Sequence, residues 1–343
     1  MQTKLIVVLG MHRSGTSAVT RGLKVVGVEL GTHLMSAADD NSKGFWEDLD
    51  LNALNVEMLQ AVNSDWHHLA SITQYDVDTL CSSGYFERAI SLISEKTCNL
   101  PIYGFKDPRV AKLLPFWSKV FSHCQLDPNY VLAIRNPINV ANSLARRNSF
   151  GTTKSYFLWL GHIIESLKGS QGAKRMLVDY DLLINSPEKE IHRIASTFGL
   201  RVDDSELKNY CDSFLDSDMR HHAQKLEDLI LDTDCPPLAK EIYTLLLNVA
   251  SGKTQIEDSI LQKKVDSWVV DFDRMKNLLI YADQLEAKVT QAAQAINERD
   301  ARIAGLNEAV AERDARIQAI TTSHSWLITK PLRWLGRILR RGA

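Results

Sequence analysis

A continuous run of apolar, mostly branched residues opens the chain. Residues 4–10, KLIVVLG, have no polar position after the lysine and end at a glycine, a pattern that predicts a strand buried on both faces of a parallel sheet. Segment 17–27 then places its apolar residues at helical spacing and ends at Gly27. A strand, a glycine-containing loop and a helix in this order predict the start of an α/β domain.

The alternation of short apolar runs and helical segments continues to about residue 198. A helix is expected from Pro137 to Arg147, because proline suits the first turn of a helix. Two further helices are expected at 155–168 and 186–198. Further strands are expected at 102–106, 130–134 and 176–180. The predicted fold class is therefore α/β, with a P-loop-like parallel sheet flanked by helices.

From about residue 282 the composition shifts towards Ala, Gln, Glu and Arg, with almost no aromatic residue. The segment 296–303, INERDARI, recurs at 310–317 as VAERDARI, a repeat of 14 residues or two heptads. One register places Val289, Ile296, Ile303, Val310 and Ile317 at position a, and Leu285, Ala292, Arg299, Leu306, Arg313 and Ile320 at position d. This pattern predicts a coiled-coil helix with two imperfect d layers. A single solvated helix is the alternative.

The last segment combines apolar and basic residues, with five basic and no acidic side chains from residue 326 onward. The segment from about 331 to 341 has the pattern of a helix that lies on an anionic membrane. It is too short and too charged to span a bilayer. The alternative is that its apolar face packs against the protein's own core or a partner. That face would hold Leu332, Leu335, Ile338 and Leu339, with Trp334 beside them.

These patterns divide the chain into a first domain at 1–270, a coiled-coil helix at 271–322 and a basic amphipathic tail at 323–343. The 343 residues include 40 basic and 42 acidic side chains, so the net charge of −2 argues against nucleic-acid binding through bulk charge. No run of residues predicts a membrane-spanning helix or a signal peptide. Five widely spaced cysteines indicate neither a disulfide framework nor a zinc site, so we expect a cytoplasmic protein.

The strongest chemical signal is the loop at residues 10–17, GMHRSGTS. A tight turn between a strand and a helix points several backbone N–H groups at one place, where the helix dipole adds partial positive charge. Both glycines of the NTPase loop GxxxxGK[ST] are present in this loop. A threonine stands at the position of the NTPase lysine, and the cationic side chain lies three places upstream of it. The sequence therefore predicts a phosphate or sulfate site, with a purely structural turn as the alternative. The candidate ligands are His12, Arg13, Ser14, Gly15, Thr16 and Ser17.

A second anion site is predicted at the end of the strand 130–134. Arg135 follows this strand, and Ser143 lies eight residues later on the next helix. A guanidinium and a hydroxyl in this arrangement can hold a further phosphate. A helix-capping or surface arginine is the alternative.

Two phosphate sites in this order resemble the sulfotransferases that use 3′-phosphoadenosine 5′-phosphosulfate (PAPS). Residues 13–16, RSGT, are similar to the family's 5′-phosphosulfate loop, and residues 135–143 are similar to its 3′-phosphate motif, including the spacing. Residues 179–199 resemble the family's Tyr-Glu-Asp-Leu strand and the helix after it, which implies that Tyr180 lies near the adenosine. The resemblance covers roughly residues 4–222 and implies PAPS as co-substrate, with no metal.

The chain looks closer to the bacterial, carbohydrate-type members, which often use a carboxylate base. The usual loop lysine is Arg13 here, and the histidine base motif of the soluble small-molecule enzymes is missing, with residues 104–109, GFKDPR, in its place. Their glycine-rich C-terminal loop is not recognisable either. Residues 219–222, MRHH, are expected to occupy a similar place.

Sulfuryl transfer needs a base for the acceptor hydroxyl and positive charge on the transferring group. Glu47 is the first candidate base, because the neighbouring Phe45 and Trp46 could desolvate it and make it a better proton acceptor. A carboxylate that only serves a helix N-terminus is the alternative role.

Two other residues remain candidates for the base. Asp107 is the second, with a salt bridge to Lys106 or Arg109 as its alternative, and His12 is the third. Lys106 and Arg13 are the expected cations on the transferring group.

The sequence thus predicts in-line transfer of a sulfuryl group from PAPS to a hydroxyl, in a carbohydrate or glycan precursor. An ATP-dependent P-loop kinase and a scaffold that uses the coiled coil are the alternatives. The tail resembles C-terminal tails of bacterial enzymes that assemble surface polysaccharides, so we expect peripheral contact with the inner membrane. The coiled coil implies a homo-oligomer.

Overall fold

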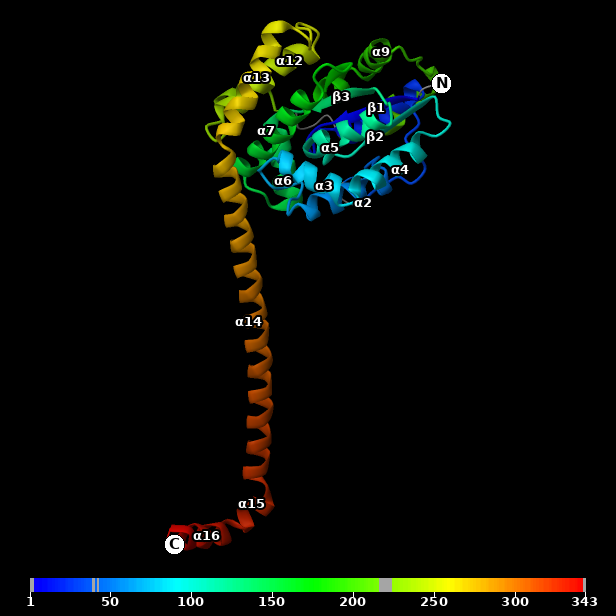
Figure 1. The fold of residues 1–343 in the computed structure, drawn as a ribbon. Helices are drawn as coiled ribbons and strands as arrows, with labels where there is room; N and C mark the ends of the chain where they lie inside the picture. Colours follow the sequence, from blue (N-terminus) through cyan, green and yellow to red (C-terminus); the bar gives the residue numbers. More distant parts are fainter. Residues whose placement is uncertain (1–2, 39–40, 42, 216–223, 342–343) are drawn as a thin grey trace. The chain divides into compact units, whose positions relative to one another are not determined.

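The computed structural model describes residues 3–38, 41, 43–215 and 224–341 (Figure 1). Residues 219–222, which the sequence placed near the site, lie outside this range. The four described strands form one parallel sheet in the order β2-β1-β3-β4, so the predicted α/β class with a parallel sheet is confirmed. The strands are β1 (Lys4–Leu9), β2 (Ile102–Lys106), β3 (Pro128–Ile134) and β4 (Arg175–Asp179).

The last strand ends one residue earlier than the sequence pattern predicts. Asp179 accepts hydrogen bonds from the backbone N–H groups of Asp181 and Leu182, each at 3.0 Å, and so caps a short helix. Tyr180 is therefore the first residue of helix α8 (Tyr180–Asn185) and not the last residue of a strand.

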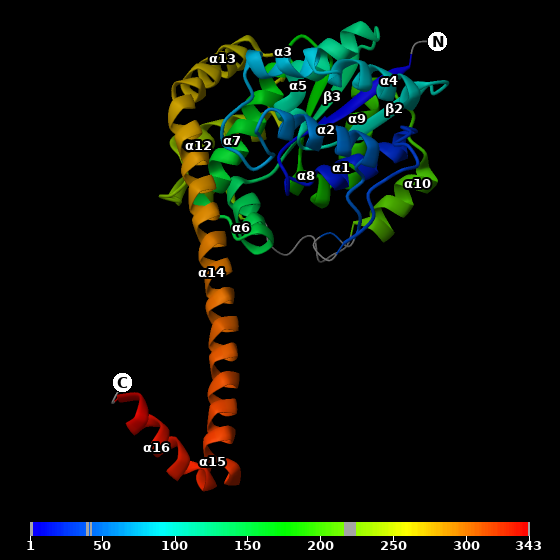
Figure 2. The same cartoon turned by 60° about the horizontal axis from the view of Figure 1, so that its bottom comes forward.

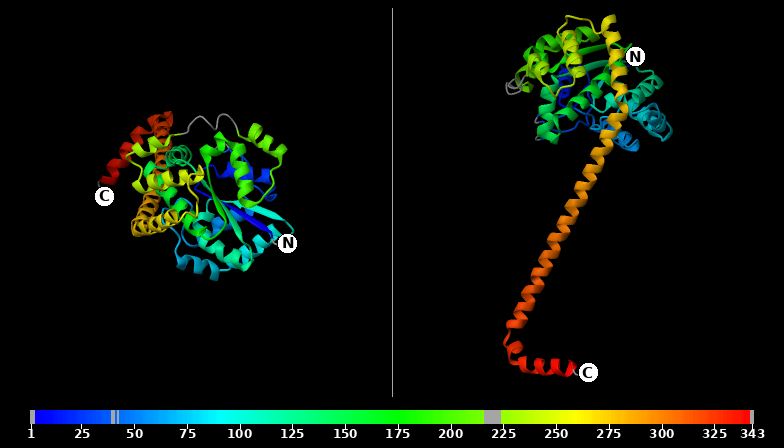
Figure 3. Two further views of the ribbon diagram at one scale, coloured as in Figure 1. Left: turned by 90° about the horizontal axis from the view of Figure 1, so that it is seen from above. Right: turned by 90° about the vertical axis from the view of Figure 1, so that its left-hand side faces the viewer.

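The sheet separates two apolar cores, because alternate residues of each strand face opposite layers. Leu5, Val7 and Leu9 of β1 belong to the larger core, whereas Ile6 and Val8 belong to the smaller one. Figures 2 and 3 show the strands between the two helical layers. The smaller core is covered by α1 (Thr16–Leu23), α8, α9 (Pro187–Phe198), α10 (Asp204–Asn209) and the π-helical turn Tyr210–Phe214.

The larger core is covered by nine described helices together with Leu279 of the long helix that follows them, and several of the nine have no clear periodic signal in the sequence. They are α2 (Leu49–Ala61), α3 (Gln74–Ser82), α4 (Tyr85–Thr97), α5 (Val110–His123), α6 (Pro137–Asn148), α7 (Thr152–Gly169), α11 (Leu226–Leu231), α12 (Pro237–Ala250) and α13 (Ser259–Arg274). A 3-10 turn, Lys24–Val26, follows α1.

The strand order places the carboxyl ends of β1 and β3 side by side. The chain leaves β1 towards β2 on one side and returns to β3 on the other, so the direction of winding reverses between β1 and β3. Open α/β sheets bind ligands in the crevice at such a reversal, outside the carboxyl ends of the strands. The 10–17 loop follows β1 and Arg135 follows β3, so the fold brings the two predicted anion sites to one edge.

The chain forms two compact units, residues 1–280 and 281–343. The long C-terminal helix is confirmed as α14 (Lys276–Thr322), an unbroken helix that Figure 3 shows in its right-hand view. It is followed by α15 (His324–Ile328) and α16 (Lys330–Arg341). None of the described helices is both long and apolar enough to cross a bilayer.

Candidate functional site

The loop between β1 and α1 makes a narrow turn. Gly10 has a φ of 149°, and a Cβ there would lie 2.6 Å from the carbonyl oxygen of Ala133 on β3. Arg13 has a φ of 69°, in the left-handed region that a side chain disfavours. Gly15, with a φ of 80°, caps α1 without a side chain. The first-turn N–H groups of α1, which have no partner within the helix, are therefore left for a ligand.

Tyr180 closes one side of this loop. A Cβ at Gly15 would lie 2.1 Å from the Tyr180 ring, so only glycine allows the ring and the loop to approach this closely. The guanidinium carbon of Arg135 lies 4.3 Å from the centre of the same ring, within cation–π distance. Arg135 also donates to the Arg13 carbonyl at 3.3 Å. The tyrosine ring thus lies between the first and second predicted anion sites.

Arg13 extends towards the second anion site. Its Nε donates to Ser143 Oγ on α6 at 2.8 Å. Arg13, Arg135 and Ser143 therefore form one cationic cluster. The sequence had assigned Arg13 to the transferring group near the 10–17 loop.

Arg13, Arg135 and Tyr180 line a pocket of about 290 Å³. Among the predicted residues, Ser14, Ser143 and Asp107 are not part of its lining. Of the charged side chains that line it, five are cationic and Glu47 is the single carboxylate. The lining comprises His12, Arg13, Gly15, Thr16, Ser17, Ala18, Asn41, Lys43, Phe45, Glu47, Lys106, Pro108, Arg135, Arg147, Tyr180 and Phe214.

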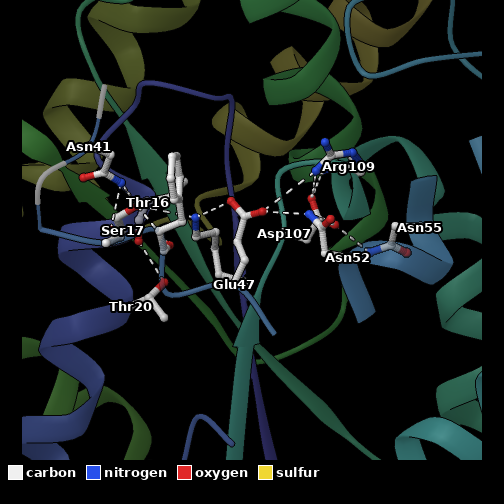
Figure 4. Close-up of polar contacts among 12 residues, drawn as sticks. Thr16, Ser17, Thr20, Asn41, Glu47, Asn52, Asn55, Asp107 and Arg109 are labelled. Atoms are coloured by element: carbon white, nitrogen blue, oxygen red, sulfur yellow. Dashed lines mark hydrogen bonds and ion pairs between the residues drawn. The ribbon is translucent and has the colours of Figure 1, made fainter. Parts of the chain in front are cut away.

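Glu47 is held in the pocket by two opposing hydrogen bonds (Figure 4). Lys106 Nζ, at the end of β2, donates to Glu47 Oε1 at 2.7 Å, and Asn52 Nδ2, in the first turn of α2, donates to Oε2 at 2.8 Å. Both partners in the ion pair are buried. Lys106 Nζ also lies 3.5 Å from Ser17 Oγ, so the ammonium group joins the carboxylate to the first turn of α1.

The backbone around Glu47 is fixed on both sides. Trp46 has a φ of 56°, an outlier for a bulky residue, and its indole N–H donates to the Lys43 carbonyl at 3.0 Å. Asp48 is the N-cap of α2, where it accepts from the N–H groups of Asp50 and Leu51. The helix-capping role considered for Glu47 therefore belongs to its neighbour.

Asp107 makes the salt bridge to Arg109 that the sequence offered as its alternative role. It is buried and accepts from Arg109 through both the backbone N–H, at 2.9 Å, and the guanidinium, at 3.0 Å. Asn55 donates to its other oxygen at 3.0 Å, and Asn52 lies 3.4 Å away. This carboxylate has its acceptor positions filled and orients residues around Glu47, as Figure 4 shows.

His12 lies at the pocket wall in a buried position. Burial, together with the positive charges of Arg109 and Arg147, lowers the pKa of His12 well below its usual value, so the ring is neutral at physiological pH. Its ring centre lies 4.3 Å from that of Trp66, and its Nε2 has no hydrogen-bond partner among the described residues.

The structure adds several polar residues that the sequence patterns did not single out, namely Asn41, Lys43, Asn52 and Arg147. Asn52 could have been found, because it lies one helical turn after the Asp48 cap and so returns to the side of Glu47. No comparable signal exists for Arg147, whose position depends on how α6 packs. Among the described residues, no three His, Cys, Asp or Glu side chains are grouped as metal ligands.

Comparison with known proteins gives distant structural likenesses. No protein-family description and no curated protein matches the sequence. The sulfotransferase domain of the Synechococcus PCC 7002 olefin synthase is 16% identical over 80% of this chain and 96% of that chain, with a TM-score of 0.38. A sulfotransferase domain from the curacin biosynthetic pathway is 11% identical over 71% and 91%, with a TM-score of 0.37. A mouse sulfotransferase complexed with PAP is 13% identical over 78% and 88%, with a TM-score of 0.36.

The contact between Gly15 and Tyr180 predicts a specific loss of anion binding. Gly15→Ala should lower stability and abolish the rise in melting temperature that inorganic pyrophosphate produces, because the added methyl displaces the ring or the loop. Gly27→Ala is the matched control: its φ of 78° carries the same left-handed cost, about 1–2 kcal/mol, but a Cβ there meets no atom within 4 Å. Thermal unfolding with and without pyrophosphate measures both effects. Equal pyrophosphate responses in the two variants would contradict the assignment.

Proposed function

We propose that this chain is a PAPS-dependent sulfotransferase that transfers a sulfuryl group to a hydroxyl acceptor. The observation that carries the proposal is the joining of two anion sites within one crevice. The N-terminus of α1 lies at the end of β1, and the cluster of Arg13, Arg135 and Ser143 lies at the end of β3. A nucleotide with phosphate at both its 5′ and 3′ positions carries two separate anionic groups, one for each of these two sites.

The chemistry of the donors fits this co-substrate. One buried polar atom of the pocket lining, Arg135 Nε, has no hydrogen-bond partner among the described residues, so it has a hydrogen bond to offer an anion. The N–H groups of α1 would hold the 5′ phosphosulfate, and Arg13, Arg135 and Ser143 would hold the 3′ phosphate. Tyr180, packed between them, would contact the nucleoside.

Glu47 is assigned the role of base, and Lys106 that of the cation next to it. When bound, PAPS supplies an activated sulfuryl group with a phosphate leaving group. Lys106 can exchange its hydrogen bond to Glu47 Oε1 for one to the group held by the loop, since it already lies 3.5 Å from Ser17 Oγ. That exchange frees Oε1 to accept the proton of the acceptor hydroxyl. Asn52 keeps Oε2 in place meanwhile.

We propose a carbohydrate or glycan precursor as the acceptor, entering beside His12. Trp66 lies against His12 there, and the Phe150 ring centre is 5.7 Å from that of Trp66. Half-buried aromatic faces offer a flat apolar surface to a sugar ring, while Arg147, 6.0 Å from the Trp66 ring, adds positive charge. The neutral His12 is positioned to hydrogen-bond a hydroxyl and is not needed as the base.

The nucleotide preference tests the proposed function. At about 100 times its Kd, 3′,5′-ADP (PAP) should stabilise the fold by roughly 2.7 kcal/mol, and the same concentration of ATP should stabilise it far less. Arg135→Ala should remove most of that preference, because the second anion site loses its guanidinium. Arg146→Ala, at an exposed position of α6, the helix that follows Arg135, is the matched control. Equal shifts of melting temperature for PAP and ATP would refute PAPS use and favour the kinase alternative.

Substitution of Glu47 tests the base. Glu47→Gln keeps the size and can still accept from Lys106, but it cannot take a proton, so turnover should fall by roughly 10²–10⁴-fold. PAP binding should stay nearly unchanged. Glu57→Gln, at an exposed position of α2, the helix that follows Glu47, should retain full turnover. Transfer of ³⁵S from labelled PAPS to a glycan panel measures the rates, and near-normal turnover of Glu47→Gln would show that another group is the base.

We also propose that α16 binds anionic membrane surfaces. Its Leu332, Trp334, Leu335 and Ile338 are between 51% and 70% exposed, alongside Arg333 and Arg337. Full-length protein should bind vesicles rich in anionic lipid in a salt-sensitive way, whereas a chain ending at residue 322 should not, while keeping its activity on a soluble acceptor. Vesicle co-sedimentation at low and high salt is the measurement. Equal binding by both chains, or by neither, would exclude this role.

A further inference from the structure

Helix α14 carries an apolar stripe with no covering element among the described residues. The apolar side chains at heptad positions a and d are between 47% and 61% exposed. The a position holds only Val and Ile over five heptads, and the d position includes two leucines. They are Leu285, Val289, Ile296, Ile303, Leu306, Val310, Ile317 and Ile320. Branched residues at a with leucine at d favour a parallel pair of helices.

The charges beside this stripe specify the direction of the partner helix. Position e, on one side, holds Glu286, Asp300 and Asp314, and position g, on the other side, holds Lys288, Arg302 and Arg316. In a parallel pair each edge sets the basic g column of one helix beside the acidic e column of the other, although each basic g side chain directly faces an uncharged e residue five positions on (Ala293, Asn307 or Thr321). An antiparallel pair would place acidic next to acidic and basic next to basic.

The two arginines at position d, Arg299 and Arg313, also need a partner. In a parallel pair, a side chain at d enters a hole bordered by positions d and e of the facing helix. Each arginine is followed directly by an aspartate, Asp300 and Asp314, at position e. Within one helix Arg299 reaches Asp300 only at 3.4 Å, with both side chains mostly exposed, which is a pair worth little.

We propose that α14 pairs with α14 of a second copy, in parallel and in register, with Arg299 and Arg313 of each copy bound to Asp300 and Asp314 of the other. Each polar layer then holds two arginines and two aspartates and is neutral. The same layers specify the register, because the repeat is 14 residues long and a shift of one heptad would set each arginine against an apolar d residue, Ala292, Leu306 or Ile320. The inference is independent of the enzymatic proposal.

A lipid surface is a less suitable partner for this apolar stripe than a second copy of the helix. Arg299 and Arg313 interrupt it at two of its central positions, and an apolar interface would have to bury both charges without counter-charges. A second copy supplies the counter-charge from the same sequence.

The first measurement is the mass of the full-length chain in solution. Sedimentation equilibrium over a range of concentrations should give a reversible dimer, and a chain ending at residue 280 should be monomeric. A monomer at all concentrations, or a trimer or tetramer, would overturn the proposal.

A charge-exchange experiment tests the crossed pairs. R299E/R313E makes positions d and e both acidic, and D300R/D314R makes them both basic, so each variant alone should be at least tenfold weaker in dimerisation. An equimolar mixture should recover a heterodimer, because every crossed contact again joins opposite charges. E298R/E312R, two changes at the outward c position of the same repeats, should dimerise like the parent chain. Failure of the mixture to recover, or equal weakening by E298R/E312R, would overturn the crossed pairs.

A cysteine at position a tests whether the two α14 helices run parallel. V289C should form an intersubunit disulfide rapidly under mild oxidation, because in a parallel, in-register pair residue 289 faces residue 289. The parent chain, with its five native cysteines, gives the background. A dimer in which V289C crosslinks no faster than the parent would show that the helices are antiparallel or out of register.

Discussion

The buried ion pair between Lys106 and Glu47 is the interaction on which the candidate site depends. Taking two charges out of water costs several kcal/mol per ion, so the pair persists only because its geometry and its additional hydrogen bonds compensate. Those bonds come from different parts of the chain: β2 supplies the lysine, the segment before α2 supplies the glutamate, and Asn52 on α2 fixes its second oxygen. The pair therefore joins the second strand of the sheet to the loop segment that closes the pocket.

The same pair connects structure to chemistry through the 10–17 loop. Lys106 Nζ lies between the carboxylate and Ser17 in the first turn of α1, so one ammonium group is within reach of both the proposed base and the proposed anion site. At the other end of the pocket, the Tyr180 ring lies against both Gly15 of the loop and Arg135 of the arginine cluster. The reversal of strand order between β1 and β3 brings both ends together. The sheet topology thus determines where the site lies, and the side chains determine its chemistry.

Much of this arrangement could be predicted from the sequence, because apolar runs and glycine positions report directly on buried strands and tight turns. The four strands follow from such runs, and the meeting of the loop with Arg135 follows from a parallel sheet. Helix α2 has no clear stripe, because the polar Asn55 occupies a core position, where it bonds to Asp107 and Trp117. The capping preference of Asp179 outweighs the apolar pattern that extended β4 to residue 180.

Side-chain direction is the part that no sequence pattern contains. Arg13 has the residue type expected for the transferring group, yet its guanidinium extends to Ser143, 130 residues along the chain. Asp107 has the right type for a base, yet Arg109, Asn55 and Asn52 occupy its oxygens. Both outcomes depend on long-range packing, which local periodicity does not describe.

The proposed function requires one crevice to hold two phosphates of the same nucleotide, one on the N-terminus of α1 and one on the arginine cluster. A crystal structure of the chain with PAP tests it most directly. The account predicts the 5′ phosphate within hydrogen-bond distance of the backbone N–H groups of Gly15, Thr16 and Ser17. It predicts the 3′ phosphate on Arg13, Arg135 and Ser143, with the nucleoside against Tyr180. A nucleotide that binds elsewhere, or whose 3′ phosphate faces solvent without contact to Arg135, would contradict the account.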